Sequence, residues 1–133
     1  NLTFDPVTGI FGVIGSANIS NAVVIGNTTT TWGTFTTSTV TANQTIASVP
    51  VTGITGVQFL VKGVDASGSK YSVATVQAVT NGTSNVDYAT YGTVNLGGYT
   101  GALAVNIQGG YLRLQVTPAS GNSTVWTTQY NYI

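Results

Sequence analysis

Residues 56–79, GVQFLVKGVDASGSKYSVATVQAV, contain two runs in which apolar and polar side chains alternate. In the first run, residues 57–62, every second side chain is apolar, and Leu60 is the one apolar residue on the polar side. Alternation with a period of two is typical of a β-strand with one buried face. The second run, residues 71–76, alternates in the same way, and residues 65–69 between the runs favour turns. The pattern predicts a β-hairpin around which the other strands are added.

Further short strands are expected before and after this hairpin. Residues 27–43 are rich in Thr, which favours either one long exposed strand or two strands kinked at Gly33. Pro50 indicates an edge strand or a strand end, because proline has no N–H to donate. Gly109-Gly110 indicates a tight hairpin turn. The other expected strands are residues 45–51, 86–96, 102–107, 111–116 and 124–133, whereas residues 10–14 and 22–25 are short apolar runs separated by turn residues.

About eight to ten strands at spacings of about ten residues predict an all-β protein, and the fold expected is an antiparallel β-sandwich. A jelly roll is one form that such a sandwich takes. The abundance of Thr and Val and the 17 Gly argue against helices. A length of 133 residues suits a single domain, residues 1–133. Residues 1–45 fit the pattern less clearly, and one interpretation is an N-terminal strand extension.

Charge is scarce, since only 5% of the residues are charged and the formal net charge is zero. Three cations cannot build the basic patch that nucleic acid or an anionic membrane surface requires, so neither partner is expected. No apolar run approaches the roughly 20 residues of a membrane-spanning helix. A chain with no net charge tends to self-associate, which suits a subunit of an assembly. Asn1 is not an initiator Met, so the chain is expected to be processed or part of a longer protein.

The sequence lacks His, Cys and Glu, which removes most general bases and activated nucleophiles. An enzyme is therefore not expected, and neither a catalytic residue, a cofactor nor a metal site is assigned. The three carboxylates, Asp5, Asp65 and Asp87, do not show the spacing of a calcium loop, and zinc would need His or Cys. Asp65 and Asp87 are interpreted as turn residues that cap local backbone. Asp65 could also pair with Lys70 across the hairpin loop, which is expected to be a solvated tip.

Four aromatic residues are the remaining candidates for a binding role: Trp32, Trp126, Tyr130 and Tyr132. Flat rings on the rim of a β-sandwich can stack on sugars, but an aromatic residue in a strand is more often a core residue or a cross-strand partner. Trp126, Tyr130 and Tyr132 share one face by period two. They fit a core face or a contact between subunits better than a sugar platform. The four residues are kept as possible glycan or subunit contacts.

Three segments, FLVKGVDASGSKYSVATVQAV, DYATYGTV and GYLRLQVTPASGNSTVWTTQY, together resemble a module at the C-terminal ends of virion structural proteins of marine tailed phages, including cyanophages. The resemblance covers residues 57–133 and does not extend clearly to the first 45 or so residues. It implies a non-enzymatic component of the virion surface, namely a fibre, spike or capsid-decorating subunit. The implied partners are other copies of the chain and other virion proteins, and the family brings no catalytic residues.

Two other functions stay open. The aromatic side chains and polar Thr-rich faces also suit a carbohydrate-binding or receptor-binding module that contacts host surface glycans. A subunit of a bacterial surface filament would fit the composition equally well without the resemblance. A virion module and a receptor-binding module can coincide in the tip of a tail fibre.

Overall fold

The computed structural model describes residues 2–13, 22–25 and 28–133, and their regular structure consists of eleven β-strands without a helix. The strands are β1 (Leu2–Asp5), β2 (Ile10–Val13), β3 (Ala22–Ile25), β4 (Thr28–Thr37), β5 (Gln44–Pro50), β6 (Gly56–Asp65), β7 (Lys70–Thr80), β8 (Val86–Leu96), β9 (Gly101–Gln108), β10 (Tyr111–Pro118) and β11 (Thr124–Tyr132). The prediction of an all-β chain is confirmed. The sequence did not assign β1, β2 and β3 as strands, because four residues are too few to show a period of two. Residue 14 of the apolar run 10–14 and residue 27 of the Thr-rich segment lie outside the described residues.

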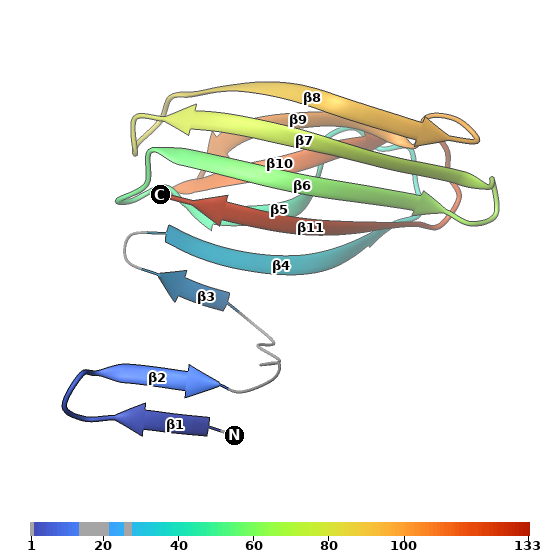
Figure 1. Cartoon of the computed structure of the whole chain (residues 1–133). Helices are drawn as coiled ribbons and strands as arrows, with labels where there is room; N and C mark the ends of the chain where they lie inside the picture. Colours follow the sequence, from blue (N-terminus) through green and yellow to red (C-terminus); the bar gives the residue numbers. More distant parts are fainter. Residues whose placement is uncertain (1, 14–21, 26–27) are drawn as a thin grey trace.

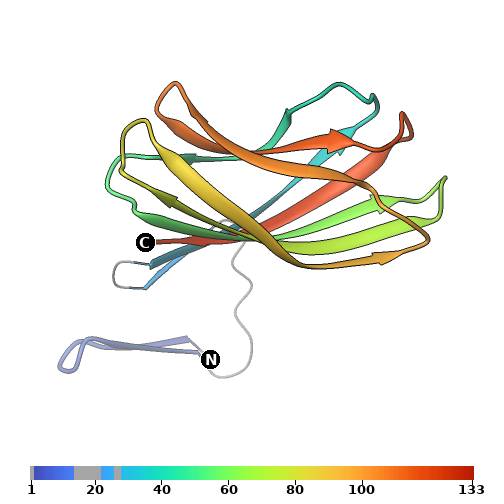
Figure 2. The ribbon, with the colours of Figure 1, turned by 90° about the horizontal axis from the view of Figure 1, so that it is seen from above.

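Nine of these strands form two antiparallel sheets that face each other (Figures 1 and 2). The larger sheet has the order β3-β4-β11-β6-β7-β8, and the smaller one has the order β5-β10-β9. Strands β1 and β2 pair only with each other among the described strands. Two packed antiparallel sheets make a β-sandwich, as the sequence predicts.

The jelly-roll form does not describe this sandwich. A jelly roll divides eight strands between two sheets through two Greek keys. Here three consecutive strands, β6, β7 and β8, lie side by side in one sheet of six, and the sheet opposite has three strands. Strand β11 is the last strand in the sequence, yet it lies between β4 and β6 in the larger sheet and pairs with both.

The core lies between the two sheets and follows the period-two pattern of the sequence. Val57, Phe59 and Val61 of β6 are buried, and the alternate residues point away from the core. Leu112 and Leu114 of β10 are buried opposite them. The hairpin expected from residues 56–79 is confirmed, because β6 and β7 pair along their whole length. The remaining core residues are Ile46, Val49, Val51, Ile54, Val76, Ala78, Val105, Val116 and Trp126.

The other local predictions also have clear outcomes. Strand β4 runs through Gly33 without a break, so the Thr-rich segment forms one strand followed by a loop from residue 38. Pro50 is the last residue of β5, which is an edge strand of the smaller sheet. Gly109 and Gly110 both have positive φ, as a primed hairpin turn between β9 and β10 requires.

The tip of the loop between β6 and β7 is exposed at Ala66, Ser67 and Ser69, as expected, but Asp65 at its base is only 1% exposed. Its carboxylate accepts hydrogen bonds from the Gly68 N–H at 2.9 Å, from the Ser120 hydroxyl at 3.0 Å and from the Asn122 amide at 3.0 Å. The capping of local backbone is therefore confirmed, and the same side chain also ties this loop to the one between β10 and β11. These hydrogen bonds, led by the one from Gly68, hold the pKa of Asp65 below its ordinary value, and the charge of Lys70 adds the smallest effect.

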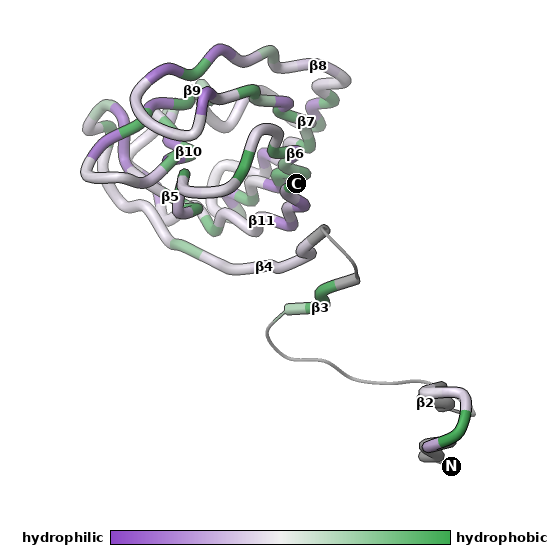
Figure 3. Tube along the Cα trace, turned by 90° about the vertical axis from the view of Figure 1, so that its left-hand side faces the viewer, coloured by the Kyte–Doolittle hydropathy of each residue, from purple (hydrophilic) through white to green (hydrophobic). Residues whose placement is uncertain are grey.

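Strand β8 is an edge strand of the larger sheet and is exposed on both of its faces. Every residue after Val86 in this strand is exposed, and among the described strands it pairs with β7 alone. Hydrophobic and hydrophilic residues are interspersed along it (Figure 3). A β-bulge interrupts its pairing with β7 near Gly92, which has a positive φ. The uncovered side of β8 leaves room between the sheets next to β9.

Candidate functional site

The outer face of the six-stranded sheet, defined as the side that points away from the smaller sheet, carries a row of side chains across five strands. Trp32 of β4 lies opposite Gln129 of β11, which lies opposite Leu60 of β6. Leu60 in turn lies opposite Thr75 of β7, which lies opposite Tyr91 of β8. An aromatic ring therefore stands at each end of the row, with an amide and a hydroxyl group between them.

Two neighbouring hollows run along this row and share Gln129. The first, of about 350 Å³, lies at β3, β4 and β11 and is lined by Trp32 and Thr127 as well as Gln129. The second, of about 280 Å³, is lined by Gln58, Leu60 and other residues of β7 and β11. The Gln58 amide donates a hydrogen bond to the Tyr91 hydroxyl at 3.1 Å, which orients both side chains. The row therefore combines exposed rings with neutral amide groups that can both donate and accept hydrogen bonds.

Trp32 is 54% exposed, so the structure places it where a partner could reach its ring. Trp126 is only 2% exposed and lies on the opposite, core-facing side of the sheet. Its indole N–H donates a buried hydrogen bond to the Thr37 hydroxyl at 3.0 Å. Its ring packs over Gly63, the residue opposite it on β6. In this structure Trp126 holds β4, β6 and β11 together.

Tyr130 and Tyr132 are half-buried and pack against the core. The rings of Tyr130 and Phe59 have centroids 5.3 Å apart and are tilted by 46°, a common geometry for an aromatic pair. Burial raises the pKa of the Tyr130 hydroxyl above its ordinary value, while a hydrogen bond with Thr31 lowers it. Of the four aromatic candidates, Trp32 is thus the one on the outer face. The other three share the core-facing side, and a role of any of the four in binding stays a prediction.

Sequence reasoning missed the partners of Trp32 in the row. Gln129 and Tyr91 look like ordinary strand residues, and only the register shows that they lie in line with Trp32. Leu60 was visible as an apolar residue on a polar face, and its exposure on the outer face explains that irregularity. Among these partners of Trp32, Leu60 is thus the one that could be recognised as unusual from the sequence.

Two structural observations bear on other kinds of site. Within the described ranges, no group of three or more His, Cys, Asp or Glu side chains comes together as metal ligands would. The described residues also include no helix of the length and apolar character needed to cross a membrane.

No protein-family model and no curated protein matches this chain. Among solved structures, the tailspike protein of Acinetobacter baumannii phage AM24 matches 80% of the chain with a TM-score of 0.54 and 10% identity. The tailspike protein gp49 of Acinetobacter baumannii bacteriophage Fri1, described as a capsular polysaccharide depolymerase, matches 98% with a TM-score of 0.49 and 11% identity. The tailspike protein of Acinetobacter phage vB_ApiP_P1 matches 88% with a TM-score of 0.47 and 15% identity.

The matched parts are 26%, 19% and 24% of those three chains, so this chain spans about a quarter of their length or less. At 10% identity the AM24 match shows a shared fold. A β-sandwich like this one therefore occurs as part of a phage tailspike protein.

Proposed function

We propose that the chain is a non-enzymatic structural module of a phage tail protein and lies on the surface of the virion. The observation that carries this proposal is the fold shared with the AM24 tailspike over 80% of the chain. The resemblance of residues 57–133 to C-terminal modules of marine tailed-phage proteins supports it independently. A fibre or spike subunit fits both observations. In this proposal residues 1–133 act as one domain, and β4 and β5 extend the recognisable module toward the N-terminus because they pair with β11 and β10.

Self-association is part of this proposal, and an apolar patch at one end of the outer face supports it. Val73 lies opposite Val94, and Tyr71 lies opposite Leu96. Val94 and Leu96 are 67% and 70% exposed, and the two residues opposite them are also exposed. Contiguous apolar side chains on the surface of a chain with so little charge favour contact with another protein surface. A second copy of the chain is the proposed occupant.

Two measurements test the virion module. Mass spectrometry of purified virions should detect the protein, and analytical ultracentrifugation should show an oligomer. Replacing Val94 and Leu96 together by Lys should dissociate that oligomer, because it places two charges in the contact. The control is Val40→Lys, which changes an exposed valine in the loop after β4. A wild-type chain that is monomeric and absent from virions would contradict the proposal.

A second candidate function is recognition of a host surface polysaccharide on the outer face. The specific observation in its favour is the exposed ring of Trp32 beside the hollow that contains Gln129. The Fri1 tailspike is described as acting on capsular polysaccharide, which suggests the class of ligand. No observation on the described residues favours the bacterial surface-filament alternative in a comparable way.

Binding to purified capsular polysaccharides on an array tests this second candidate. Trp32→Ala should abolish binding, since it removes the one exposed ring beside the hollow. Phe35→Ala is the matched control, because Phe35 is an exposed aromatic residue of the same strand on the opposite face. Wild-type protein that binds no polysaccharide, or binding that survives Trp32→Ala, would reject the candidate.

A further inference from the structure

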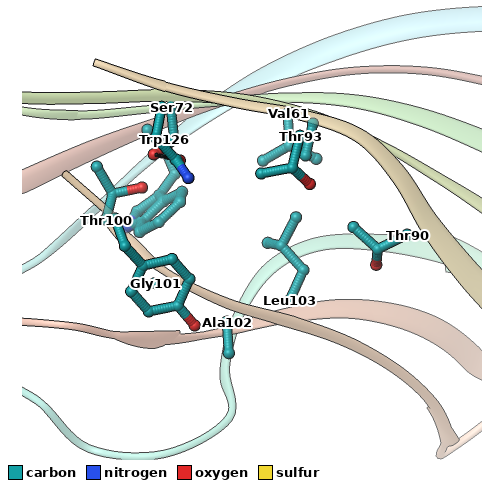
Figure 4. A pocket seen from close by; sticks show the side chains of 13 residues that line it. Val61, Ser72, Thr90, Thr93, Thr100, Gly101, Ala102, Leu103 and Trp126 are labelled. Carbon is teal, nitrogen blue, oxygen red and sulfur yellow. Dashed lines mark hydrogen bonds between the residues drawn. The ribbon is translucent and has the colours of Figure 1, made fainter. Parts of the chain in front are cut away.

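Arg113 of β10 stands on the outer face of the smaller sheet, which is the side that points away from the six-stranded sheet. Its neighbours Leu112 and Leu114 are buried in the core, so the residue between them points the opposite way. On the adjacent strand β9, Leu103 points into the pocket between the two sheets (Figure 4), and Asn106 lies on the other face by the period of two. Arg113 and Asn106 lie directly opposite each other, so both belong to this outer face.

Two neutral side chains of β9 hold the guanidinium group of Arg113. Its Nε–H donates a hydrogen bond to the Asn106 side-chain oxygen at 3.1 Å, and one of its Nη–H groups donates to the Gln108 side-chain oxygen. A guanidinium carries more N–H donors than these two bonds use, so it is oriented and still has donors for another partner. Because a guanidinium only donates, both amides must turn their oxygens toward it. Their NH2 groups are thereby left to donate to other partners.

The positive charge of Arg113 is not paired with a carboxylate among the side chains that the structure describes. Asp65 is engaged with the loop after β10, and Asp87 is exposed on β8 of the other sheet. Amide oxygens orient a guanidinium but do not neutralise it, so an anion would gain charge-assisted hydrogen bonds there. The planar fork matches the two oxygens of a carboxylate, and one cation balances its single charge better than the roughly double charge of a phosphate. A carboxylate is therefore the ligand group that fits.

An exposed ring and a hydroxyl group flank this charge. Tyr111, two residues along β10 on the same face, is 48% exposed and lies opposite Gln108. Ser48 is exposed on β5 and lies on the other side of Arg113. Side chains on one face of a strand repeat at about 6.6–6.8 Å and neighbouring strands lie about 4.8 Å apart, so these groups surround an area of the size of one sugar ring.

We propose that this face of β5, β10 and β9 binds an acidic sugar residue, a hexuronic acid, of a surface polysaccharide. The carboxylate of the sugar pairs with the Arg113 fork, its hydroxyl groups accept hydrogen bonds from the Asn106 and Gln108 NH2 groups, and its C–H surface packs on the Tyr111 ring. The choice of a carboxylate rests on Arg113, whereas the choice of a sugar as its carrier rests on the proposed recognition of a host polysaccharide. The surface is separate from Trp32, which stands on the outer face of the other sheet.

NMR titration of the isotope-labelled chain with D-glucuronate and D-galacturonate tests this proposal, with D-glucose and D-galactose as the matched neutral sugars. At low ionic strength, where exposed charges are least screened, at least one acid should cause saturable shifts of the backbone amides at residues 106–108 and 111–114. The matching neutral sugar should bind much more weakly. Wild-type protein that shows no saturable shift with either acid, or equal shifts with the acid and its neutral match, would overturn the proposal. Binding of polysaccharide at Trp32 is tested separately by the array and by Trp32→Ala.

Substitutions at the site and at a second cation locate the binding. Arg113→Gln removes the charge but keeps a polar side chain, so the affinity for the acid should fall by about 10-fold or more, the effect of hydrogen bonds to a charged group. Arg113→Lys keeps the charge without the fork and should lie between the two, and Tyr111→Ala should also weaken binding. Lys62→Gln is the control, since Lys62 is an exposed cation on the outer face of the six-stranded sheet, and it should leave the affinity unchanged. Unchanged affinity in Arg113→Gln would refute the proposal, provided that its urea midpoint shows a folded chain.

A carboxylate of a second copy is the other source of the same chemical group. If Asp87 of a neighbouring copy occupied the fork, both Arg113→Gln and Asp87→Asn would dissociate the oligomer in analytical ultracentrifugation. That result would overturn the assignment of the site to a sugar. The expected result is an oligomer that neither substitution changes, with the loss in Arg113→Gln confined to binding of the acidic sugar.

Discussion

Gly63 is the position where the packing of Trp126 makes the sharpest prediction. A Cβ atom added there would lie 2.5 Å and 2.9 Å from two ring carbons of Trp126 and 2.8 Å from the Thr100 hydroxyl. Carbon atoms pack comfortably at about 3.5–4.0 Å, so the ring would have to move. It is held in place by burial and by its hydrogen bond to Thr37. We expect Gly63→Ala to suffer an overpacking cost of about 1–3 kcal/mol.

Gly33→Ala is a matched control on another strand of the same sheet. The nearest atom to a Cβ added there is the Thr128 hydroxyl at 4.0 Å, an ordinary contact. Replacing glycine by alanine without strain restricts the unfolded chain and stabilises a protein by roughly 0.4–1 kcal/mol. This gain applies to both variants, so their free energies of unfolding should differ by the overpacking cost alone.

Equilibrium unfolding in urea, followed by far-ultraviolet circular dichroism, measures this difference. The midpoint should fall for Gly63→Ala and should stay level or rise for Gly33→Ala, with the same slope for both variants. Near-ultraviolet circular dichroism should also change in Gly63→Ala, because the environment of the Trp126 ring is altered. Equal midpoints for the two variants would refute the tight contact between β6 and the Trp126 ring.

Three further predictions concern polar and turn positions. Thr37→Val should lower the free energy of unfolding by about 1–3 kcal/mol, because it leaves the Trp126 N–H buried and unpaired. The same substitution in a Trp126→Phe background should cost much less, and an equal loss there would contradict this cause. The pKa of Asp65 is lowered in the folded state, so its stabilisation is present above the ordinary pKa of an aspartate and is lost as the pH falls through the folded pKa. Asp65→Asn should flatten this acid-induced loss in a pH series of thermal unfolding, and an unchanged profile would count against it. Gly97→Ala should be more destabilising than Gly109→Ala in thermal unfolding. Both glycines have a positive φ, but only a Cβ added at Gly97 would meet a backbone oxygen, that of Ser69, at 2.0 Å. Equal losses of stability would mean that the strain of the positive φ decides by itself.

The parts of the fold that depend on local pattern could be predicted from the sequence. Alternation identified the buried faces of β6 and β10, and paired glycines identified the turn at residues 109–110. These features depend on neighbours only a few residues apart. The position of β11 between β4 and β6 depends on contacts between distant segments, and a period of two cannot specify which strands meet.

The candidate site was less accessible to prediction for the same reason. Trp32 and Trp126 look alike in the sequence, since each stands in a Thr-rich strand, yet they lie on opposite faces of one sheet. Asp65 was expected at a solvated tip because the hydroxyl and amide donors that bury it come from residues 120 and 122. A turn motif shows its own backbone partner but not a partner from a loop more than 50 residues away.

The position of β11 also has a consequence for how the protein is made. Among the described strands, β3 and β4 have no place in the larger sheet until β11 has joined β6. All the other strands of the sandwich leave the ribosome before β11 does. During that interval the edges of β4 and β6 and the space that Trp126 will fill are open to other chains. Sheets closed by such distant segments form slowly, so synthesis on neighbouring ribosomes would favour exchange of β11 between nascent copies.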